Sequence, residues 1–391
     1  MNKLTLEDLD LAGKKVLTRV DYNVPLSDGR ITDDHRVRQT LPTVKAIVEG
    51  GGIAVLMSHL GRPKGKVAEE LRLTPVAACL QELIGRPVKK TDTVVGEDAA
   101  RAVQDAKPGD IVLLENLRFE AGETACDDDF VRKLTAFGDV YVNDAFGAAH
   151  RAHASVVGPP RTLKAAAGFL MQKELEYFGK LLESPDRPYV AILGGAKVSD
   201  KIAVIEKLLE SVDRILVGGA MAYTFLAAQG KAVGASRVEE DRLDVARETL
   251  EKAKAAGVTL ELPSDHVVAS EFSAASTPGV VEEIPEGKMG LDIGPKSIER
   301  YREVIAGAKT VVWNGPMGVF EWESFRKGTE AVARAMAESS ATTVVGGGDS
   351  AAAIRLLGFD ERVSHVSTGG GASLEMLEGK TLPGVEALTD R

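Results

Sequence analysis

A cation, a carboxylate and an amide stand together where an apolar run ends early in the chain. The segment RVDYNVP places Arg19, Asp21 and Asn23 at alternating positions, which lie on one side of an extended segment. In this arrangement Arg19 would anchor Asp21, while Asp21 and Asn23 would receive a hydroxyl group of a bound molecule. The alternative for the same residues is a salt-bridged turn with no ligand.

Further cations follow the next apolar runs of the first half or stand in polar loops. They occur in SHLGRP, in LENLRFE, in AHRAHAS and in one more polar stretch, as His59, Arg62, Arg118, Arg151 and Arg36. One arginine alone is usually a solvated surface residue, but several at one edge of a parallel sheet favour a binding site. Because the planar guanidinium suits carboxylates and phosphates, the pattern predicts a small ligand with several negative charges.

Glycine clusters mark the second half of the chain. Apolar runs end there in the segments AILGGAK, ILVGGAM, VVWNGPM, TVVGGGDS and VSTGGGAS, each where a strand would pass into a helix. Glycine lets backbone N–H groups approach a phosphate, and a helix N-terminus favours negative charge. One such cluster would indicate a tight turn, whereas five favour a nucleotide-binding cleft at the carboxyl ends of the strands.

The elements that must position these residues alternate between short apolar runs and amphipathic stretches. Strands are expected at residues 15–20, 53–58, 111–114, 140–143, 189–193, 214–217, 310–313 and 343–345. Helices are expected at residues 34–49, 76–84, 130–137, 201–210, 239–256, 325–338 and 351–356. This spacing predicts parallel sheets of the α/β class, with right-handed crossovers that place helices on both faces.

A domain boundary is expected near residues 165–188. Residues 163–182 have the pattern of one long helix, with apolar residues at Phe169, Leu170, Leu175, Phe178, Leu181 and Leu182. The turn segment SPDRP follows, and a second series of βαβ units begins directly after it. The length of 391 residues also suggests two domains, at roughly 100–200 residues each.

The composition excludes several classes of protein. Hydrophobic residues make up 44% and charged residues 27% of the chain, which is typical of a folded soluble protein. The net charge of −10 argues against a general nucleic-acid coat protein, although residues 1–168 are nearly balanced, with 23 basic and 24 acidic residues. The two cysteines indicate neither a disulfide framework nor a zinc site. Since no signal peptide or membrane span is evident, the cytoplasm is the expected compartment.

Taken together, these segments resemble those of phosphoglycerate kinases, and the resemblance covers the chain nearly from end to end. The matching segments, in order, are RVDYNVP, SHLGRP, LENLRFE, AHRAHAS, LGGAKVSDK, WNGPMGVFEWE, GGGDS and STGGGASLE. The family transfers a phosphoryl group reversibly between ATP and the carboxylate of 3-phosphoglycerate, with ADP and 1,3-bisphosphoglycerate as products. The resemblance therefore implies a glycolytic kinase with two doubly wound parallel-sheet domains joined by a helical hinge. It also implies a monomer that binds neither nucleic acid nor a membrane.

The same resemblance implies one substrate for each domain. The acid would bind the N-terminal domain, residues 1–168, and the tail 381–391 would pack back against this domain. Mg²⁺ and the nucleotide would bind the C-terminal domain, residues 169–380, which includes the hinge helix. The hinge candidates are residues 163–182 with SPDRP and the loop 368–371. Because the reacting atoms would begin on separate domains, the domains would have to close.

The resemblance also assigns site residues. The acid site would consist of Arg19, Asp21, Asn23, Arg36, His59, Leu60, Gly61, Arg62, Arg118 and Arg151. The nucleotide site would consist of Gly195, Lys197, Lys201, Gly290, Asn314, Glu321, Gly347, Gly348, Asp349 and Ser350. The groups that act on the transferring phosphoryl group would be Arg36, Lys197 and the helix start at Gly371. Glu321 would hold the ribose hydroxyls, and Asp349 would be the Mg²⁺ ligand. Ser350 stands where threonine is common in the family and keeps a hydroxyl.

The chemistry of the acceptor explains why no catalytic base is expected. A carboxylate is already ionised at pH 7, because carboxyl groups have pKa values of about 4. Kinases that act on hydroxyls often place an aspartate to accept the proton, whereas here positioning and charge neutralisation suffice. The segment LGGAK is also not a P-loop, since G-x-x-x-x-G-K-[ST] does not occur in the chain.

Two other classes of protein stay open as alternatives. A nicotinamide-dependent oxidoreductase would also use doubly wound sheets, but it needs G-x-G-x-x-G after a strand, and no early strand ends that way. A non-catalytic anion-binding protein with two domains would keep the arginines, but it would not need Lys197, Lys201 and Asp349 beside glycine loops.

Overall fold

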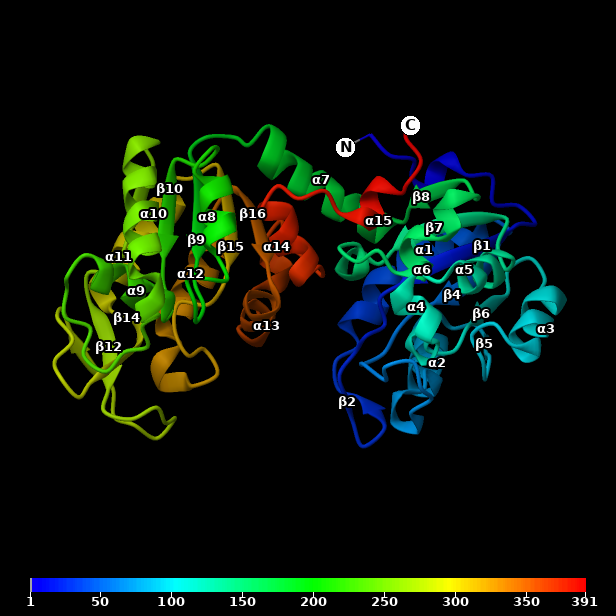
Figure 1. Ribbon diagram of the computed structural model, residues 1–391, viewed down its shortest axis with the longest axis horizontal. Helices are drawn as coiled ribbons and strands as arrows, with labels where there is room; N and C mark the ends of the chain where they lie inside the picture. The colour runs from blue at the N-terminus through cyan, green and yellow to red at the C-terminus, as the bar shows by residue number, and fades with distance from the viewer. Residues whose placement is uncertain (1) are drawn as a thin grey trace. The chain divides into compact units, whose positions relative to one another are not determined.

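The computed structural model describes residues 2–391 and divides into two compact units. Unit 1 consists of Met1–Glu176 together with Thr381–Arg391, and unit 2 is Tyr177–Lys380. The chain therefore passes between the units twice, once inside a helix and once near the C-terminus. Figure 1 shows both units, with labels on many of their helices and strands.

Unit 1 is built on a six-stranded parallel sheet with the strand order β5-β6-β4-β1-β7-β8. Its strands are β1 (Lys15–Val20), β4 (Ile53–Met57), β5 (Val88–Lys90), β6 (Ile111–Leu113), β7 (Val140–Asp144) and β8 (Ala165–Ala167). Every residue of β4, β6, β7 and β8 is buried, which shows that both faces of the sheet are covered. A small hairpin, β2 (Leu26–Ser27) and β3 (Arg30–Ile31), follows β1.

Helices cover both faces of this sheet. They are α1 (His35–Glu49), α2 (Thr74–Ile84), α3 (Glu97–Asp105), α4 (Ala121–Ala125), α5 (Asp128–Thr135) and α6 (Ala154–Val157). On one face, Val44 and Ile47 of α1 and Leu80 of α2 pack against alternate strand residues such as Val16 and Leu56. On the other face the Tyr141 hydroxyl of β7 donates to the Ser155 carbonyl of α6. Because side chains alternate along each strand, the strands contribute residues to a core on each face of the sheet.

Unit 2 repeats this architecture with the strand order β11-β10-β9-β15-β16-β17. The strands are β9 (Tyr189–Leu193), β10 (Arg214–Val217), β11 (Thr259–Glu261), β15 (Thr310–Asn314), β16 (Thr342–Gly346) and β17 (His365–Val366). Along the chain, β10 and β11 follow β9 on one side of it, and β15, β16 and β17 then form the other side. In sheets of this order, ligands bind at the carboxyl ends of the strands where the direction reverses. That point lies between β9 and β15.

The helices of unit 2 cover the two faces of its sheet, and a second sheet stands beside it. The helices are α8 (Ile202–Leu208), α9 (Met221–Ala228), α10 (Leu243–Ala255), α11 (Pro295–Ala306), α12 (Lys327–Glu338), α13 (Gly348–Leu356) and α14 (Gly371–Leu377). Trp313 of β15 packs with Tyr301 of α11 and Met336 of α12 in the core. The second sheet is antiparallel and consists of β12 (His266–Ala269), β13 (Gly279–Val281) and β14 (Met289–Ile293). The sequence patterns did not predict this small sheet.

The expected strands are confirmed, and three of them have the predicted bounds, β1, β9 and β10. One helix prediction is wrong. Residues 163–182 do not form a single helix, because Ala165–Ala167 form β8 and helix α7 begins only at Phe169 and ends at Glu183. The Asp144 carboxylate accepts hydrogen bonds from the backbone N–H groups of Leu170 (2.9 Å) and Met171 (3.2 Å). This buried carboxylate at the end of β7 sets the start of α7, since it binds N–H groups that the first turn of a helix leaves unpaired.

The C-terminal tail lies against unit 1. It contains a short helix, α15 (Pro383–Glu386), although its sequence suggested no element. The Thr389 carbonyl accepts from the Leu4 backbone N–H, and the Thr389 N–H donates to the Ala165 carbonyl. The Arg391 N–H donates to the Asn2 carbonyl, which joins the tail to the N-terminal segment. Within residues 2–391, every helix is too short or too polar to span a bilayer.

Candidate active site

Four arginines of unit 1 gather at the carboxyl ends of neighbouring strands. Arg19 lies in β1, whereas Arg62, Arg118 and Arg151 follow β4, β6 and β7, and the sheet order is β6-β4-β1-β7. Burial, followed by the positive charges of Arg151 and Arg19, lowers the pKa of Arg118 to about 10. Holding like charges this close costs free energy, and a ligand with several negative charges would reduce that cost.

Asp21 is the carboxylate of this site. The Arg36 guanidinium, near the start of α1, donates to Asp21 Oδ2 over 2.5 Å. Burial alone would raise the pKa of Asp21, but positive charge, above all that of Arg36 and also that of Arg19, outweighs it and holds the pKa below its usual value. Asp21 is therefore an ionised acceptor at neutral pH, and it can accept a hydrogen bond from a ligand hydroxyl.

Arg19 does not have the role that its spacing suggested. Its buried guanidinium donates to the Ser155 hydroxyl (2.9 Å) and to the Val20 carbonyl, and it contacts His59 Nδ1 at 3.0 Å. The expectation that Arg19 anchors Asp21 is wrong, because β1 ends at Val20 and the alternation of a strand does not continue to Asp21. Arg19 lies beneath the site and supports it.

The contact with Arg19 sets the state of His59. Arginine only donates hydrogen bonds, so His59 Nδ1 must accept and the ring proton must be on Nε2. Burial lowers the pKa of His59 well below its usual range, and the Asp21 carboxylate offsets this only in part. His59 is therefore neutral at pH 7 and offers one N–H donor, at Nε2.

Two other predicted residues hold the loop between His59 and Arg62. The Gly61 backbone N–H donates to Asn23 Oδ1 over 2.9 Å, and the Gly61 carbonyl accepts from Arg118 Nη1 over 2.6 Å. Segments that follow β1, β4 and β6 are thus tied to one another. All ten of the residues predicted for the acid site lie in unit 1. Nine of them lie in or after β1, β4, β6 and β7, and Arg36 lies near the start of α1.

An apolar cavity of about 500 Å³ lies in unit 2. It lies at the carboxyl ends of the strands, between the point where β9 and β15 meet and the antiparallel sheet. Its lining includes Gly195 after β9, Tyr223 of α9, Gly290 and Leu291 of β14, Phe320 and Glu321. Gly290 cannot carry a larger side chain, because a Cβ atom there would lie 2.1 Å from the Tyr223 hydroxyl oxygen. A flat apolar group with one polar edge suits such a space.

A second cavity of about 470 Å³ adjoins the first, and the two share Gly195, Ala196 and Asp349. Glycine loops from the ends of β9, β15 and β16 line it, together with the start of α14. The predicted nucleotide residues in this lining are Gly195, Lys197, Lys201, Asn314, Gly347, Gly348, Asp349 and Ser350. The lining also includes Gly371, and the other two predicted residues, Gly290 and Glu321, line the first cavity.

The second cavity offers donors for an anion. Helix α13 begins at Gly348 with no side chain capping its N-terminus, and the preceding Gly347 has φ of +88°, which favours glycine. Lys201 donates to Asn314 Oδ1, while the buried Asn314 Nδ2 has no partner among residues 2–391. Burial lowers the pKa of Lys201, but the carboxylates of Asp200 and Asp349 oppose the shift.

Ser350 connects two loops that line this cavity. It is fully buried, and its hydroxyl oxygen accepts from the Gly315 backbone N–H over 2.5 Å. Its hydroxyl thus joins the loop after β15 to the first turn of α13.

Comparisons with known proteins agree with this geometry. The phosphoglycerate kinase family matches residues 6–380 of the chain. The phosphoglycerate kinase of Clostridium novyi (strain NT) is 57% identical over 396 residues, with 100% of both chains covered. The chain belongs to the phosphoglycerate kinase family. The phosphoglycerate kinase of Moorella thermoacetica is likewise 57% identical, over 393 residues and 100% of both chains.

Solved structures of phosphoglycerate kinases share the fold. The structure from Coxiella burnetii is 41% identical with a TM-score of 0.90, and the one from Pyrococcus horikoshii OT3 is 35% identical with a TM-score of 0.87. Each comparison covers 98% of both chains. As a member of the phosphoglycerate kinase family, the chain is an ATP-binding kinase of glycolysis, and the fold and activity implied by its sequence are confirmed. The oxidoreductase and the non-catalytic binding protein find no support.

Sequence reasoning missed several residues around the two sites. Tyr223 and Phe272 line the apolar cavity, and only the glycine cluster before Tyr223 gave a signal near either of them. Ser155 binds Arg19, and the buried Glu123 accepts from both the backbone N–H and the hydroxyl of Ser155. Asn116 lies inside the segment LENLRFE, from which only Arg118 was chosen.

A buried carboxylate behind the apolar cavity leads to a prediction about stability. Asp292 of β14 accepts from the backbone N–H groups of Gly328 (2.7 Å) and Ile293 (2.9 Å). Burial raises its pKa to about 7, although these hydrogen bonds oppose the shift. Folded Asp292 therefore holds its proton to higher pH than unfolded Asp292. Stability should fall as pH rises from about 4 to about 7, by at most about 1.4 kcal/mol per pH unit.

Urea unfolding at several pH values would check this prediction. Between pH 5 and pH 7.5, the wild type should lose stability relative to Asp292→Asn, which cannot ionise. Glu361→Gln, at an exposed position, is the matched control and should run parallel to the wild type. A constant difference between the wild type and Asp292→Asn across this range would contradict the prediction.

Proposed function

We propose that unit 1 binds 3-phosphoglycerate at its arginine cluster and that unit 2 binds Mg²⁺ and ATP in its two joined cavities. The chain would then transfer a phosphoryl group reversibly between ATP and 3-phosphoglycerate. One observation carries the proposal, namely the contrast between the two sites. Crowded arginines suit a small molecule with several negative charges, whereas an apolar cavity that continues into glycine loops and lysines suits a nucleotide.

In unit 1, we assign the distal phosphate of the acid to Arg62, Arg118 and Arg151, whose guanidiniums can bind it at several oxygens. Asp21 and Asn23 would take the hydroxyl group, and His59 would donate from Nε2. Leu60 and Gly61 form the loop wall beside His59. The buried Arg19 orients the His59 ring through their contact at 3.0 Å.

In unit 2, we assign the base to the apolar cavity beside Gly290, and the ribose hydroxyls to the Glu321 carboxylate. The phosphates would lie in the second cavity, where Lys201, Asn314 Nδ2 and the N-terminus of α13 supply donors. Lys197 lies in the loop between β9 and α8 and is exposed, so its flexible side chain can follow the transferring group. The N-terminus of α14 at Gly371 would face the γ-phosphate.

The residues present also fit Mg²⁺. Asp349 lies where the two cavities meet, and Mg²⁺ is usually held by one or two carboxylates together with substrate phosphates. Within residues 2–391, no group of three or more His, Cys, Asp or Glu residues would hold an ion by itself. Asp349 would therefore hold the metal together with the nucleotide. When bound, Mg²⁺ would neutralise charge on the phosphate oxygens.

The transfer itself needs no proton acceptor in this proposal. The attacking oxygen belongs to a carboxylate that is ionised at pH 7. The chain's contribution is to align the two substrates and to neutralise the charge on the transferring group, with Arg36 from unit 1 and Lys197 from unit 2. In the reverse direction the same groups would stabilise the phosphoryl group as it leaves the acyl phosphate.

Because Arg36 and Lys197 belong to different units, we propose that the units close on the substrates. The chain crosses between the units at residues 176 and 177, inside α7, and again at residues 380 and 381. Reaction requires the two reacting atoms to approach within about 3–3.5 Å. Small-angle scattering should therefore give a smaller radius of gyration with both substrates than with either alone. Equal radii in all three states of an active enzyme would exclude closure.

Two measurements test the function. Isothermal titration should show binding of ATP and of 3-phosphoglycerate but not of NAD. A coupled assay with ATP, Mg²⁺ and 3-phosphoglycerate should show turnover. Binding of both ligands without turnover would leave an anion-binding protein and would overturn the proposal. We further propose a monomer, because each site is built within one chain, and a cytoplasmic location, where glycolytic intermediates and ATP are available.

A further inference from the structure

A buried side-chain amide joins two loops of the arginine site. Asn116 follows β6 and is fully buried. Its Oδ1 accepts from the backbone N–H groups of Leu60 and Arg118, both over 3.1 Å. Its Nδ2 donates to the carbonyls of Leu60 (2.7 Å) and Leu71 (2.9 Å). The two lone pairs and two N–H groups of the amide are thus all used.

Asn116 binds both backbone groups of Leu60. One amide holds the N–H and the carbonyl of this residue, and so it fixes the orientation of both peptide groups around it. His59 precedes Leu60, and Gly61, whose carbonyl binds the Arg118 guanidinium over 2.6 Å, follows it. The same amide oxygen holds the backbone of Arg118. Asn116 therefore fixes the loop that carries His59 and the segment that carries Arg118 relative to each other.

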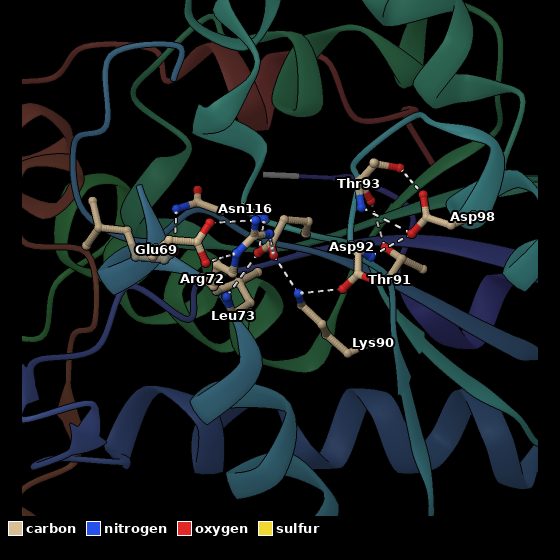
Figure 2. Close-up of polar contacts among 11 residues, drawn as sticks. Glu69, Arg72, Leu73, Lys90, Thr91, Asp92, Thr93, Asp98 and Asn116 are labelled. Atoms are coloured by element: carbon tan, nitrogen blue, oxygen red, sulfur yellow. Dashed lines mark hydrogen bonds and ion pairs between the residues drawn. The ribbon is translucent and has the colours of Figure 1, made fainter. Parts of the chain in front are cut away.

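Glu115 in turn fixes Asn116. Its carboxylate is 1% exposed, and Oε1 accepts from the backbone N–H groups of Asn116 (2.8 Å) and Leu73 (3.0 Å). The other oxygen, Oε2, pairs with Arg72 (3.0 Å) and Lys90 (2.5 Å). Asn116, Arg72, Leu73 and Lys90 converge in Figure 2. Two cations and two N–H groups satisfy a carboxylate that would otherwise be costly to bury.

We propose that Asn116, anchored by Glu115, is a positioning residue for the acid site of unit 1. It does not touch the substrate in this proposal. It holds the loop 59–62 and the Arg118 segment at the separation that the distal phosphate requires. The inference rests on the proposed binding of 3-phosphoglycerate by unit 1. Its effect should be confined to that substrate, because the nucleotide cavities are lined by unit 2 alone.

The test is steady-state kinetics with Asn116→Leu, which keeps the approximate size of the side chain and removes all four hydrogen bonds. The KM for 3-phosphoglycerate should rise between about 10-fold and 100-fold, the range expected when binding groups are displaced by about 1 Å. The KM for ATP should stay within about twofold of the wild type. A rise in both KM values, or in neither, would overturn the inference.

If Asn116→Leu does not fold, a second variant tests the same proposal. Glu115→Gln keeps an acceptor for the N–H groups of Asn116 and Leu73 but turns its NH₂ group toward Arg72 and Lys90. It should raise the KM for 3-phosphoglycerate about 3-fold or more, with the KM for ATP unchanged. The matched control is Asp98→Ala, which removes the bonds of Asp98 to the backbone of Asp92 and Thr93 in the same region (Figure 2). This control should lower the unfolding midpoint and leave both KM values unchanged.

Titration of the wild type separates the two levels of the proposal. If the wild-type chain does not bind 3-phosphoglycerate, the proposed function fails. If the wild type binds it and Glu115→Gln or folded Asn116→Leu binds it equally well, only the positioning role fails.

Discussion

Replacing Arg36 with alanine is expected to lower kcat at least about 100-fold, the scale of losing one preorganised donor to a transition state. The side chain is about one third exposed and ion-paired with Asp21 over 2.5 Å, so it is held in place before the substrates arrive. Substrate binding should weaken less, because Arg62, Arg118 and Arg151 would still hold the distal phosphate. Steady-state kinetics with 3-phosphoglycerate and ATP would measure both quantities.

The neighbouring Arg38 provides the control for this variant. It lies on the same helix, is more exposed, and pairs with Asp34 over 2.8 Å. Arg38→Ala should leave kcat within about twofold of the wild type. Equal losses of kcat in the two variants, or an unchanged kcat in Arg36→Ala, would remove Arg36 from the mechanism.

The second large effect is expected at Lys197, and its contrast with Lys201 is informative. Lys201 is half-buried and bonded to Asn314 Oδ1, and in the proposed site it would contact the nucleotide phosphates before the transfer. Lys197 is exposed at the edge of the same cavity and can engage the phosphoryl group as it moves. Lys197→Ala should therefore lower kcat by about 100-fold or more, whereas Lys201→Ala should mainly weaken nucleotide binding.

Isothermal titration with ADP and steady-state kinetics would separate the two lysines. The Kd for ADP should rise about 10-fold or more in Lys201→Ala and stay close to the wild type in Lys197→Ala. The control is Lys207→Ala in α8, where the lysine pairs with Glu210 at the surface. Equal changes in Kd and kcat for Lys197→Ala and Lys201→Ala would reject this division of roles.

Parallel strands were the elements most accessible from sequence. The run at 189–193 is continuous and apolar because β9 is buried on both faces, and the structure has β9 with those bounds. The run at 15–20 is apolar at Val16, Leu17 and Val20, and it also has the bounds of its strand, β1. The glycine clusters were equally informative. Where a strand ends and a helix begins, the backbone can approach a phosphate closely only at a residue without a side chain. Residues 163–182 were misjudged because three alanines have no periodicity that separates a strand from a helix.

The pairing of side chains was decided by the tertiary structure alone. Asp21 pairs with Arg36, 15 residues away, because β1 ends before Asp21 and α1 returns to the same sheet edge. Leu60 and Asn116 are separated by 56 residues, yet one amide holds both backbone groups of Leu60. Local sequence therefore determined which residues end each strand. Which of them meet depended on the order of strands in the sheet, since β4 lies next to both β1 and β6 only after the chain has folded.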